Sequence, residues 1–242
     1  MNLISKGSTN AKTKKNRRES VIMYMSPDKQ NSKGISVCPK ASKGCSAACL
    51  YNSGRGKFTS VQQARIRKTE YYLNDKQGFA EQLLKELGLL SKRATKNGNT
   101  IAVRLNGTSD LDLINLIKSR TGVEPIGIPN LVYYDYTKIL GKIKKYIDTP
   151  YRLTFSKSEE NWSECVQALE MGVPVSVVFS TTKNEELPTE YAGYRVLDGD
   201  TADDIMLDEP GAYILGLRFK GSKKEMEEAI KSGFVIDLRE KI

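Results

Sequence analysis

The chain has 242 residues, of which 39% are hydrophobic and 28% are charged. This length and composition are typical of a soluble protein with one large domain or two small ones. No run of about 18 apolar residues occurs, which excludes a membrane-spanning helix. The charged N-terminus is not followed by the apolar segment of a secretory signal, so we expect a cytoplasmic protein.

The charge balance is basic, because 38 Lys and Arg residues stand against 29 Asp and Glu residues, a net charge of +9. Such an excess favours a polyanionic partner, and nucleic acid, with DNA the favoured form, is expected. Lys6–Arg18 carries six basic residues and no acidic one. We expect residues 1–20 to be a flexible basic arm, either solvated or in contact with DNA, and residues 21–242 to form a single domain.

The sequence contains no histidine. This excludes Ser-His-Asp and Cys-His catalysis, histidine-ligated zinc and acid–base chemistry by imidazole. Any reaction must therefore use carboxylates, Lys, Arg, Tyr, hydroxyl groups, thiols or a cofactor.

The expected elements begin with a short strand at Val21–Met25, followed by turns and a cysteine-bearing loop. Helical spacing of apolar residues then predicts helices over Thr59–Leu73 and Phe79–Lys96. Further strands are expected at Thr100–Leu105, Leu131–Tyr134, Tyr151–Phe155, Val173–Phe179, Arg195–Leu197, Tyr213–Leu217 and Phe234–Leu238. Helices are expected between several of them, over Leu111–Ser119, Lys138–Tyr146 and Trp162–Met171.

Short apolar strands separated by helices are typical of right-handed βα units, which form a parallel sheet covered on both faces. The number of strands favours an α/β fold in which a parallel (β/α) barrel, complete or partial, follows an N-terminal cysteine-rich loop segment. A doubly wound open sheet is the alternative.

Polar residues follow most of the expected strands, and in parallel α/β proteins this carboxyl end carries the chemistry. If the sheet closes, these groups converge on one rim. The candidate catalytic carboxylates are Asp110, Asp135, Asp198 and Asp200. The candidate substrate-binding residues at these strand ends are Arg104, Asn106, Ser109, Thr137, Lys138, Ser156 and Lys220. Any one of them could instead cap a helix or form a turn.

Arg104 differs from these neighbours because it lies inside an apolar strand. A charge in that position needs a partner or a ligand. Asp110, Asp135 and Asp198 are the natural partners.

Three cysteines, Cys38, Cys45 and Cys49, lie in a segment rich in Gly, Lys and Ser. Such a loop can fold three thiolates around one centre, and disulfides are not expected in the cytoplasm. We therefore expect a metal site that holds zinc or a [4Fe–4S] cluster. Structural zinc takes four ligands, and the fourth cysteine, Cys165, lies in a predicted helix where a core position is expected.

Three thiolates with one open iron is the arrangement of radical S-adenosylmethionine enzymes, which would add S-adenosylmethionine as a cofactor. The spacing of those enzymes is three residues and then two, whereas here it is six and then three. No glycine-rich segment for S-adenosylmethionine stands out.

The segment Gly54–Lys57 after the cysteines is predicted to be a flexible basic loop, and its Arg55 and Lys57 are candidate phosphate ligands. Its spacing is not that of a P-loop. Arg65, Arg67 and Lys68 on the next helix are expected to extend a basic face.

Five ordered blocks of this chain resemble the phage and plasmid family called gene product 88, over roughly residues 35–238. The blocks are the cysteine segment through Cys49-Leu50-Tyr51-Asn52 and Gly54-Arg55-Gly56, Arg104–Asp110, Tyr134–Lys138, Leu153–Ser156 and Asp198-Gly199-Asp200. The resemblance implies a mobile-element protein that acts in the host cytoplasm. More distantly, the pattern is similar to two kinds of barrel enzyme, radical S-adenosylmethionine enzymes and queuine-type transglycosylases.

Three functions are compatible with these features. The first is exchange or modification of a guanine or deazaguanine base in DNA, in which the aspartates supply the nucleophile and the acid–base group, and the target base is turned out of the helix. A small-molecule base or nucleotide would be the second ligand. The second is a radical S-adenosylmethionine-like iron–sulfur enzyme. The third is a non-catalytic DNA-binding replication protein.

Overall fold

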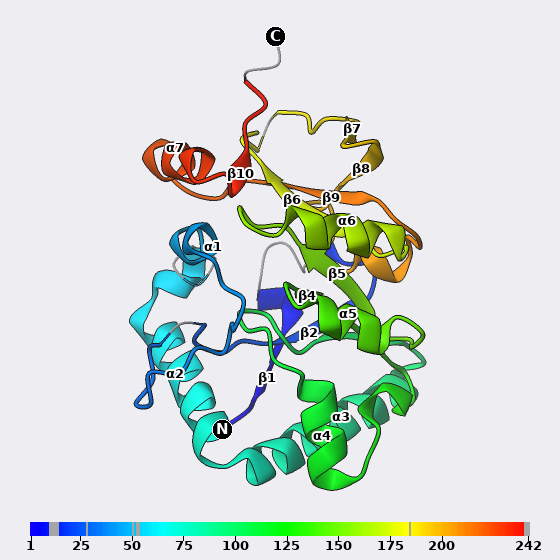
Figure 1. Ribbon diagram of the computed structural model, residues 1–242. Coiled ribbons are helices and arrows are strands. Elements are labelled where there is room, and N and C mark those ends of the chain that lie inside the picture. Colours follow the sequence, from blue (N-terminus) through cyan, green and yellow to red (C-terminus); the bar gives the residue numbers. More distant parts are fainter. Residues whose placement is uncertain (10–14, 28, 50, 52–53, 184, 240–242) are drawn as a thin grey trace.

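The computed structural model describes residues 1–9, 15–27, 29–49, 51, 54–183 and 185–239. Within these residues ten strands form one sheet, in the order β1-β2-β3-β4-β5-β6-β9-β8-β7, and β10 pairs with β6 (Figure 1). The strands are β1 Ile4–Lys6, β2 Glu19–Met23, β3 Ile101–Arg104, β4 Leu131–Thr137, β5 Arg152–Ser156, β6 Val175–Phe179, β7 Glu190–Tyr191, β8 Tyr194–Asp198, β9 Ile214–Arg218 and β10 Val235–Ile236.

The helices have the following bounds. They are α1 Lys43–Ala47, α2 Thr59–Asn74, α3 Lys76–Asn97, α4 Leu113–Thr121, α5 Leu140–Tyr146, α6 Trp162–Glu170 and α7 Lys223–Lys231. The 3-10 helices are η1 Gly7–Thr9, η4 Gly54–Lys57, η5 Pro125–Gly127 and η6 Ile205–Leu207.

The sheet is open, and the predicted barrel is therefore wrong. All pairs from β2 to β8 are parallel, as expected, but the path ends in two short antiparallel strands, β1 beside β2 and β7 beside β8. A barrel requires the last strand to pair with the first. Here the chain order reverses where β9 pairs between β6 and β8, and among the described residues the terminal strands β1 and β7 do not pair with each other.

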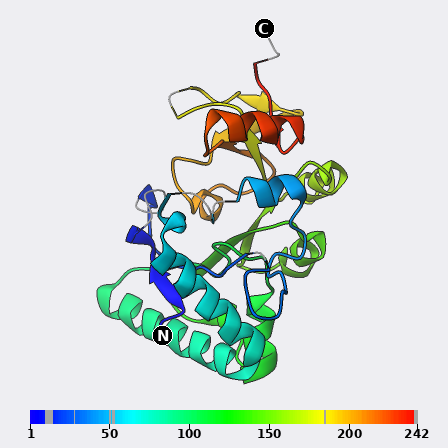
Figure 2. The ribbon, with the colours of Figure 1, turned by 90° about the vertical axis from the view of Figure 1, so that its left-hand side faces the viewer.

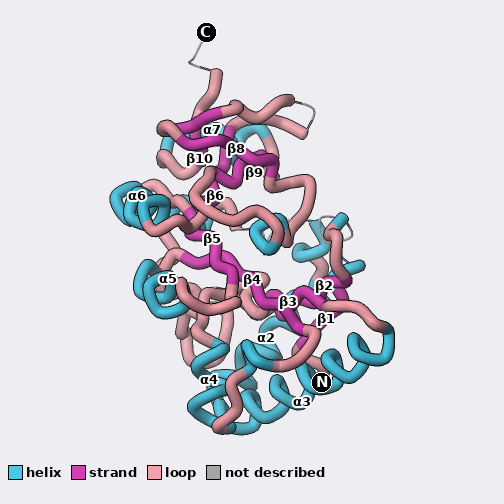
Figure 3. Tube along the Cα trace, turned by 90° about the vertical axis from the view of Figure 1, so that its right-hand side faces the viewer, coloured by secondary structure: helices cyan, strands magenta, loops and turns pink. Residues whose placement is uncertain are grey.

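Helices cover one face of the sheet, where the main core lies. Side chains at alternate positions of the strands, such as Val103 in β3 and Tyr133 in β4, pack there with α3, α4, α5 and α6. Figure 3 shows α4, α5 and α6 together on one side of the strands. The open sheet agrees with the alternative expectation in that respect, and the four helices α3 to α6 share the main core on one of its faces.

The segment that follows β8 covers the other face. A small second core there joins Ala102 and Tyr134 from neighbouring strands to Leu215 of β9 and Met206 of η6. Because β3 and β9 lie far apart in the sheet order, a shared cluster means that the sheet curls around this segment.

Part of the predicted flexible arm belongs to the sheet. β1 pairs with β2, and Leu3 is fully buried. The carboxylate of Glu86 on α3 accepts hydrogen bonds from the backbone amides of Leu3 and Ile4, both at 2.8 Å, and Lys68 Nζ donates to the Leu3 carbonyl at 2.7 Å. Residues 10–14 of the expected arm lie outside the described residues.

In the part of the chain that the structure describes, no helix is long and apolar enough to cross a membrane.

Replacing Glu86 with Ala should release the N-terminal strand, because it removes the acceptor of two partly buried hydrogen bonds. We expect hydrogen exchange at Leu3 and Ile4 to accelerate at least about tenfold, and the free energy of unfolding to fall by about 2 kcal/mol. Hydrogen-exchange mass spectrometry and urea unfolding measure the two effects. Glu81→Ala, an exposed position on the same helix, is the control. Equal exchange in the wild type and both variants would show that Glu86 does not hold this segment.

Candidate functional site at the carboxyl edge of the sheet

The cysteine segment lies across the carboxyl ends of β3, β4 and β5. After β3, the Asp110 amide donates to the Val37 carbonyl at 2.9 Å, and the Cys38 thiol donates to the Thr108 carbonyl at 3.7 Å. After β4, Lys138 Nζ donates to Cys45 Sγ at 3.2 Å. These contacts place the cysteines at the edge where parallel α/β proteins bind their substrates.

The third anchor, after β5, is the carboxylate of Glu159. It accepts from Ser42 Oγ at 2.7 Å and from the Gly44 amide at 2.6 Å. Ser42 is also the N-cap of α1, since its Oγ accepts from the Cys45 amide at 3.2 Å. A Cβ at Gly44 would lie 2.8 Å from Phe234 and 2.9 Å from Glu159, so this close docking requires glycine. In Figures 1 and 2, α1 lies between α2 and α7.

The three thiols influence one another electrostatically. Burial, together with the nearby Asp110, Cys49 and Cys45, raises the pKa of Cys38 to about 12. Burial also raises the pKa of Cys49, with Cys45 contributing. Without a bound cation, Cys38 and Cys49 are therefore neutral thiols at physiological pH.

Among the residues that the structure describes, no three Cys, Asp or Glu side chains are arranged as a finished metal site. The predicted ligands Cys38, Cys45 and Cys49 are neighbours, but they do not surround one point. Cys165 lies apart in the core: it is fully buried in α6, and its thiol donates to Asn161 Oδ1 at 3.6 Å.

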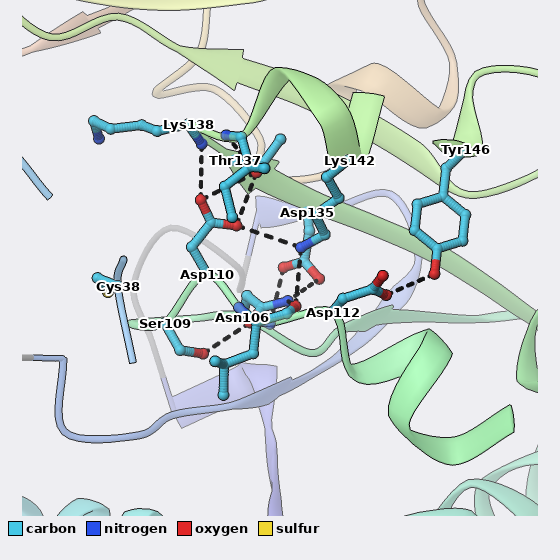
Figure 4. Close-up of polar contacts among 12 residues, drawn as sticks. Cys38, Asn106, Ser109, Asp110, Asp112, Asp135, Thr137, Lys138, Lys142 and Tyr146 are labelled. Atoms are coloured by element: carbon cyan, nitrogen blue, oxygen red, sulfur yellow. Dashed lines mark hydrogen bonds and ion pairs between the residues drawn. The ribbon is translucent and has the colours of Figure 1, made fainter. Parts of the chain in front are cut away.

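Asp110 joins the ends of β3 and β4 (Figure 4). Its carboxylate accepts from Thr137 Oγ1 at 2.8 and 3.0 Å and from the Lys138 amide at 2.8 Å. It also pairs with Lys142 Nζ at 3.4 Å, and Lys142 is only 4% exposed. The candidate catalytic residue Asp110 is thus a buried anchor for the start of α5.

Asp135 is fully buried on the helix-covered side of β4. It accepts from the Asn106 amide at 2.9 Å, from Asn106 Nδ2 at 3.1 Å and from Tyr151 Oη at 2.7 Å. Asn106 Oδ1 in turn accepts from Ser109 Oγ at 2.9 Å. Burial raises the pKa of Asp135, while Lys142 and Arg104 oppose the shift. The predicted residues Asn106 and Ser109 therefore shape the turn after β3.

Arg104 has the carboxylate partner that its buried strand position predicted. Asp135 is one neighbour, at 3.8 Å from Nε, but the closer partner is Asp203, at 2.9 Å from Nη1. The ring of Tyr136 lies under the guanidinium at 4.6 Å. Asp203 was not among the predicted partners because it comes from the segment that crosses the second face of the sheet.

Asp198 and Asp200 lie on a different stretch of the edge. Asp198 pairs with Arg218 Nη1 at 2.8 Å, and Asp200 pairs with Lys220 Nζ at 3.0 Å and accepts from the Arg218 amide at 3.0 Å. β8 stands four places from β4 in the sheet order. Because the sheet does not close, the four predicted aspartates form two groups, and Lys220 belongs with the second.

The remaining predicted ligands are scattered. Ser156 Oγ accepts from Ser176 Oγ at 3.2 Å at the end of β5. Arg55 and Lys57 are exposed on the 3-10 helix η4, so the segment predicted to be a loop is a short helix. Arg65, expected on a basic surface, is instead buried beside Cys49.

Comparison with family models matches residues 2–238 to the model described as gene product 88. The chain belongs to the gene product 88 family. The resemblance seen in five blocks is thereby confirmed over nearly the whole chain. Neither a curated protein nor a solved structure matches this gene product 88 protein.

Asp110→Ala should destabilise the protein by about 3 kcal/mol, because it leaves the buried ammonium of Lys142 without its carboxylate. Urea unfolding measures the change. Asp198→Ala is the control, since that carboxylate is 36% exposed and we expect a loss below about 1 kcal/mol. The double variant Asp110→Ala, Lys142→Met should recover much of the loss. A fully stable Asp110→Ala protein would contradict the anchoring role.

Proposed function

We propose that this gene product 88 protein is a nucleic-acid-modifying enzyme whose reactive centre comprises Cys38, Cys45 and Cys49, with zinc or a [4Fe–4S] cluster as cofactor. The docking of the cysteine segment across the ends of β3, β4 and β5 carries the proposal. A segment that only stabilised the N-terminal part would have no need of contacts with three successive strand ends.

The donor chemistry fits either cofactor. Three sulfur ligands without histidine are soft, which suits zinc and iron–sulfur clusters. Three protein ligands also leave one position open for substrate or water, as in catalytic zinc sites. Such a group supplies Lewis acidity or electrons when bound. The chain itself supplies Lys138, whose Nζ donates to Cys45 Sγ at 3.2 Å and would orient that ligand.

The aspartates offer weaker support for a reaction. Asp110 and Asp135 are buried and fully engaged, and Asp198 and Asp200 pair with Arg218 and Lys220. A carboxylate nucleophile would have to give up such partners before it attacked a sugar carbon. We therefore assign the chemistry to the thiols, and we assign structural roles to Asp110 and Asp135.

A nucleic acid is the proposed substrate because the net charge is +9 and because Arg55 and Lys57 are exposed just after the cysteines. DNA is the first polymer to test. We propose that the enzyme works in the host cytoplasm, where thiols stay reduced.

Metal analysis tests the centre directly. We expect anaerobically purified protein to hold either one zinc or an iron–sulfur cluster that absorbs near about 400 nm. Cys45→Ser should lose at least half of that metal, whereas Cys165→Ser, which changes the core cysteine, should keep it. An iron–sulfur result would also call for titration with S-adenosylmethionine. Wild-type protein without metal, or equal retention in both variants, would refute the proposed centre.

Binding to nucleic acid is tested separately, by fluorescence anisotropy with a labelled DNA oligonucleotide. We expect the affinity to fall steeply as salt rises, because released counterions drive binding. Arg55→Gln with Lys57→Gln should weaken binding at least about tenfold at low salt. Lys118→Gln with Arg120→Gln removes the same charge from the end of α4, which runs back toward the amino edge, and should have little effect. Equal losses would point to non-specific attraction and contradict a local interface.

A further inference from the structure

Arg65 on α2 is a buried cation that lacks an anionic partner. The residue is nine-tenths buried, at 9% exposure, and both Nε and Nη1 are buried without a hydrogen-bond acceptor. A guanidinium carries five N–H donors and stays charged at physiological pH. Among the described residues, no carboxylate forms an ion pair with it.

Two aromatic rings and a thiol surround this guanidinium. It lies 4.9 Å from the ring centre of Tyr24, which directly follows β2, and 5.3 Å from that of Tyr51. Tyr51 is itself buried, and its hydroxyl has no hydrogen-bond partner. Cys49 is close enough to oppose the lowering of the Arg65 pKa that burial causes. The unsatisfied donors therefore lie next to the proposed reactive centre.

The desolvation cost of the buried Arg65 guanidinium favours binding of an anion. A contact with an aromatic ring stabilises a cation only modestly. The desolvation cost of a buried ion is larger, even after the protein relaxes. The two rings therefore do not offset the desolvation cost of the guanidinium. A negatively charged ligand that accepts hydrogen bonds from Nε and Nη1 would offset it.

We propose that Arg65 binds a phosphate group of the substrate, with Tyr51 Oη as a further donor. The planar guanidinium matches the geometry of phosphate oxygens, and the basic chain attracts phosphate esters. The identity of the ligand as substrate rests on the proposed function. Its phosphate comes either from a free nucleotide or from the backbone of a nucleic acid, and the two sources differ in their binding.

Isothermal calorimetry at fixed ionic strength tests this assignment, with inorganic phosphate, adenosine monophosphate and a short single-stranded DNA as ligands and acetate as the comparison anion. We expect the phosphate ligands to bind the wild-type protein, and Arg65→Gln to weaken them at least about tenfold. Arg67→Gln changes an exposed arginine on the same helix and should bind as the wild type does. Arg65→Lys keeps the charge and should give an intermediate affinity, which guards against a folding defect of the first variant.

The outcomes separate this inference from the proposed centre. Tighter binding of DNA than of the mononucleotide identifies the backbone as the source, and the reverse identifies a free nucleotide. Absence of phosphate binding, equal binding of acetate, or equal losses in Arg65→Gln and Arg67→Gln would overturn the assignment. Metal content is measured on the same samples. Metal-loaded protein that binds no phosphate overturns only the role of Arg65, whereas phosphate binding by metal-free protein leaves that role standing and counts only against the thiol centre.

Discussion

The carboxylate of Asp110 is the junction on which the carboxyl edge depends. Its side chain holds the end of β4 through Thr137 and the Lys138 amide, and it compensates the buried charge of Lys142 on α5. Its backbone amide holds the cysteine segment at Val37. One residue thus sets the positions of two strand ends, one helix and the loop that carries the thiols.

In this arrangement the buried carboxylates have structural roles, and we assign the chemistry to other groups. Three buried carboxylates, Asp110, Asp135 and Asp203, each accept from several donors, so they define shape and compensate the cations Lys142 and Arg104. The edge also carries polar groups of other kinds: three neighbouring thiols, and the buried donors of Arg65 and Tyr51, which have no hydrogen-bond acceptor among the described residues. A buried donor without an acceptor destabilises the fold unless a ligand accepts its hydrogen bond.

Local patterns predicted much of the fold. Helical spacing predicted α2 and α3 closely, and apolar runs predicted β3 to β6, β8 and β9. The prediction of a closed barrel was wrong because β9 pairs between β6 and β8. This position depends on tertiary pairing, and no local sequence pattern in these strands indicates it. The position of Arg104 inside an apolar strand predicted that it needs a carboxylate partner. The identity of that partner was not predictable, because Asp203 lies 99 residues away in an irregular segment. Arg65 looked like a surface residue because its burial results from rings on two other segments.

The open sheet has a consequence for association between molecules. A closed barrel has no free strand edges, whereas this sheet ends in β1 and β7, and an exposed edge invites pairing with another chain. Both terminal strands are short, three and two residues, and the amides of Leu3 and Ile4 already donate to Glu86. At the β1 end, the fold thereby withholds from neighbouring copies two donors through which a sheet could extend from one molecule into the next.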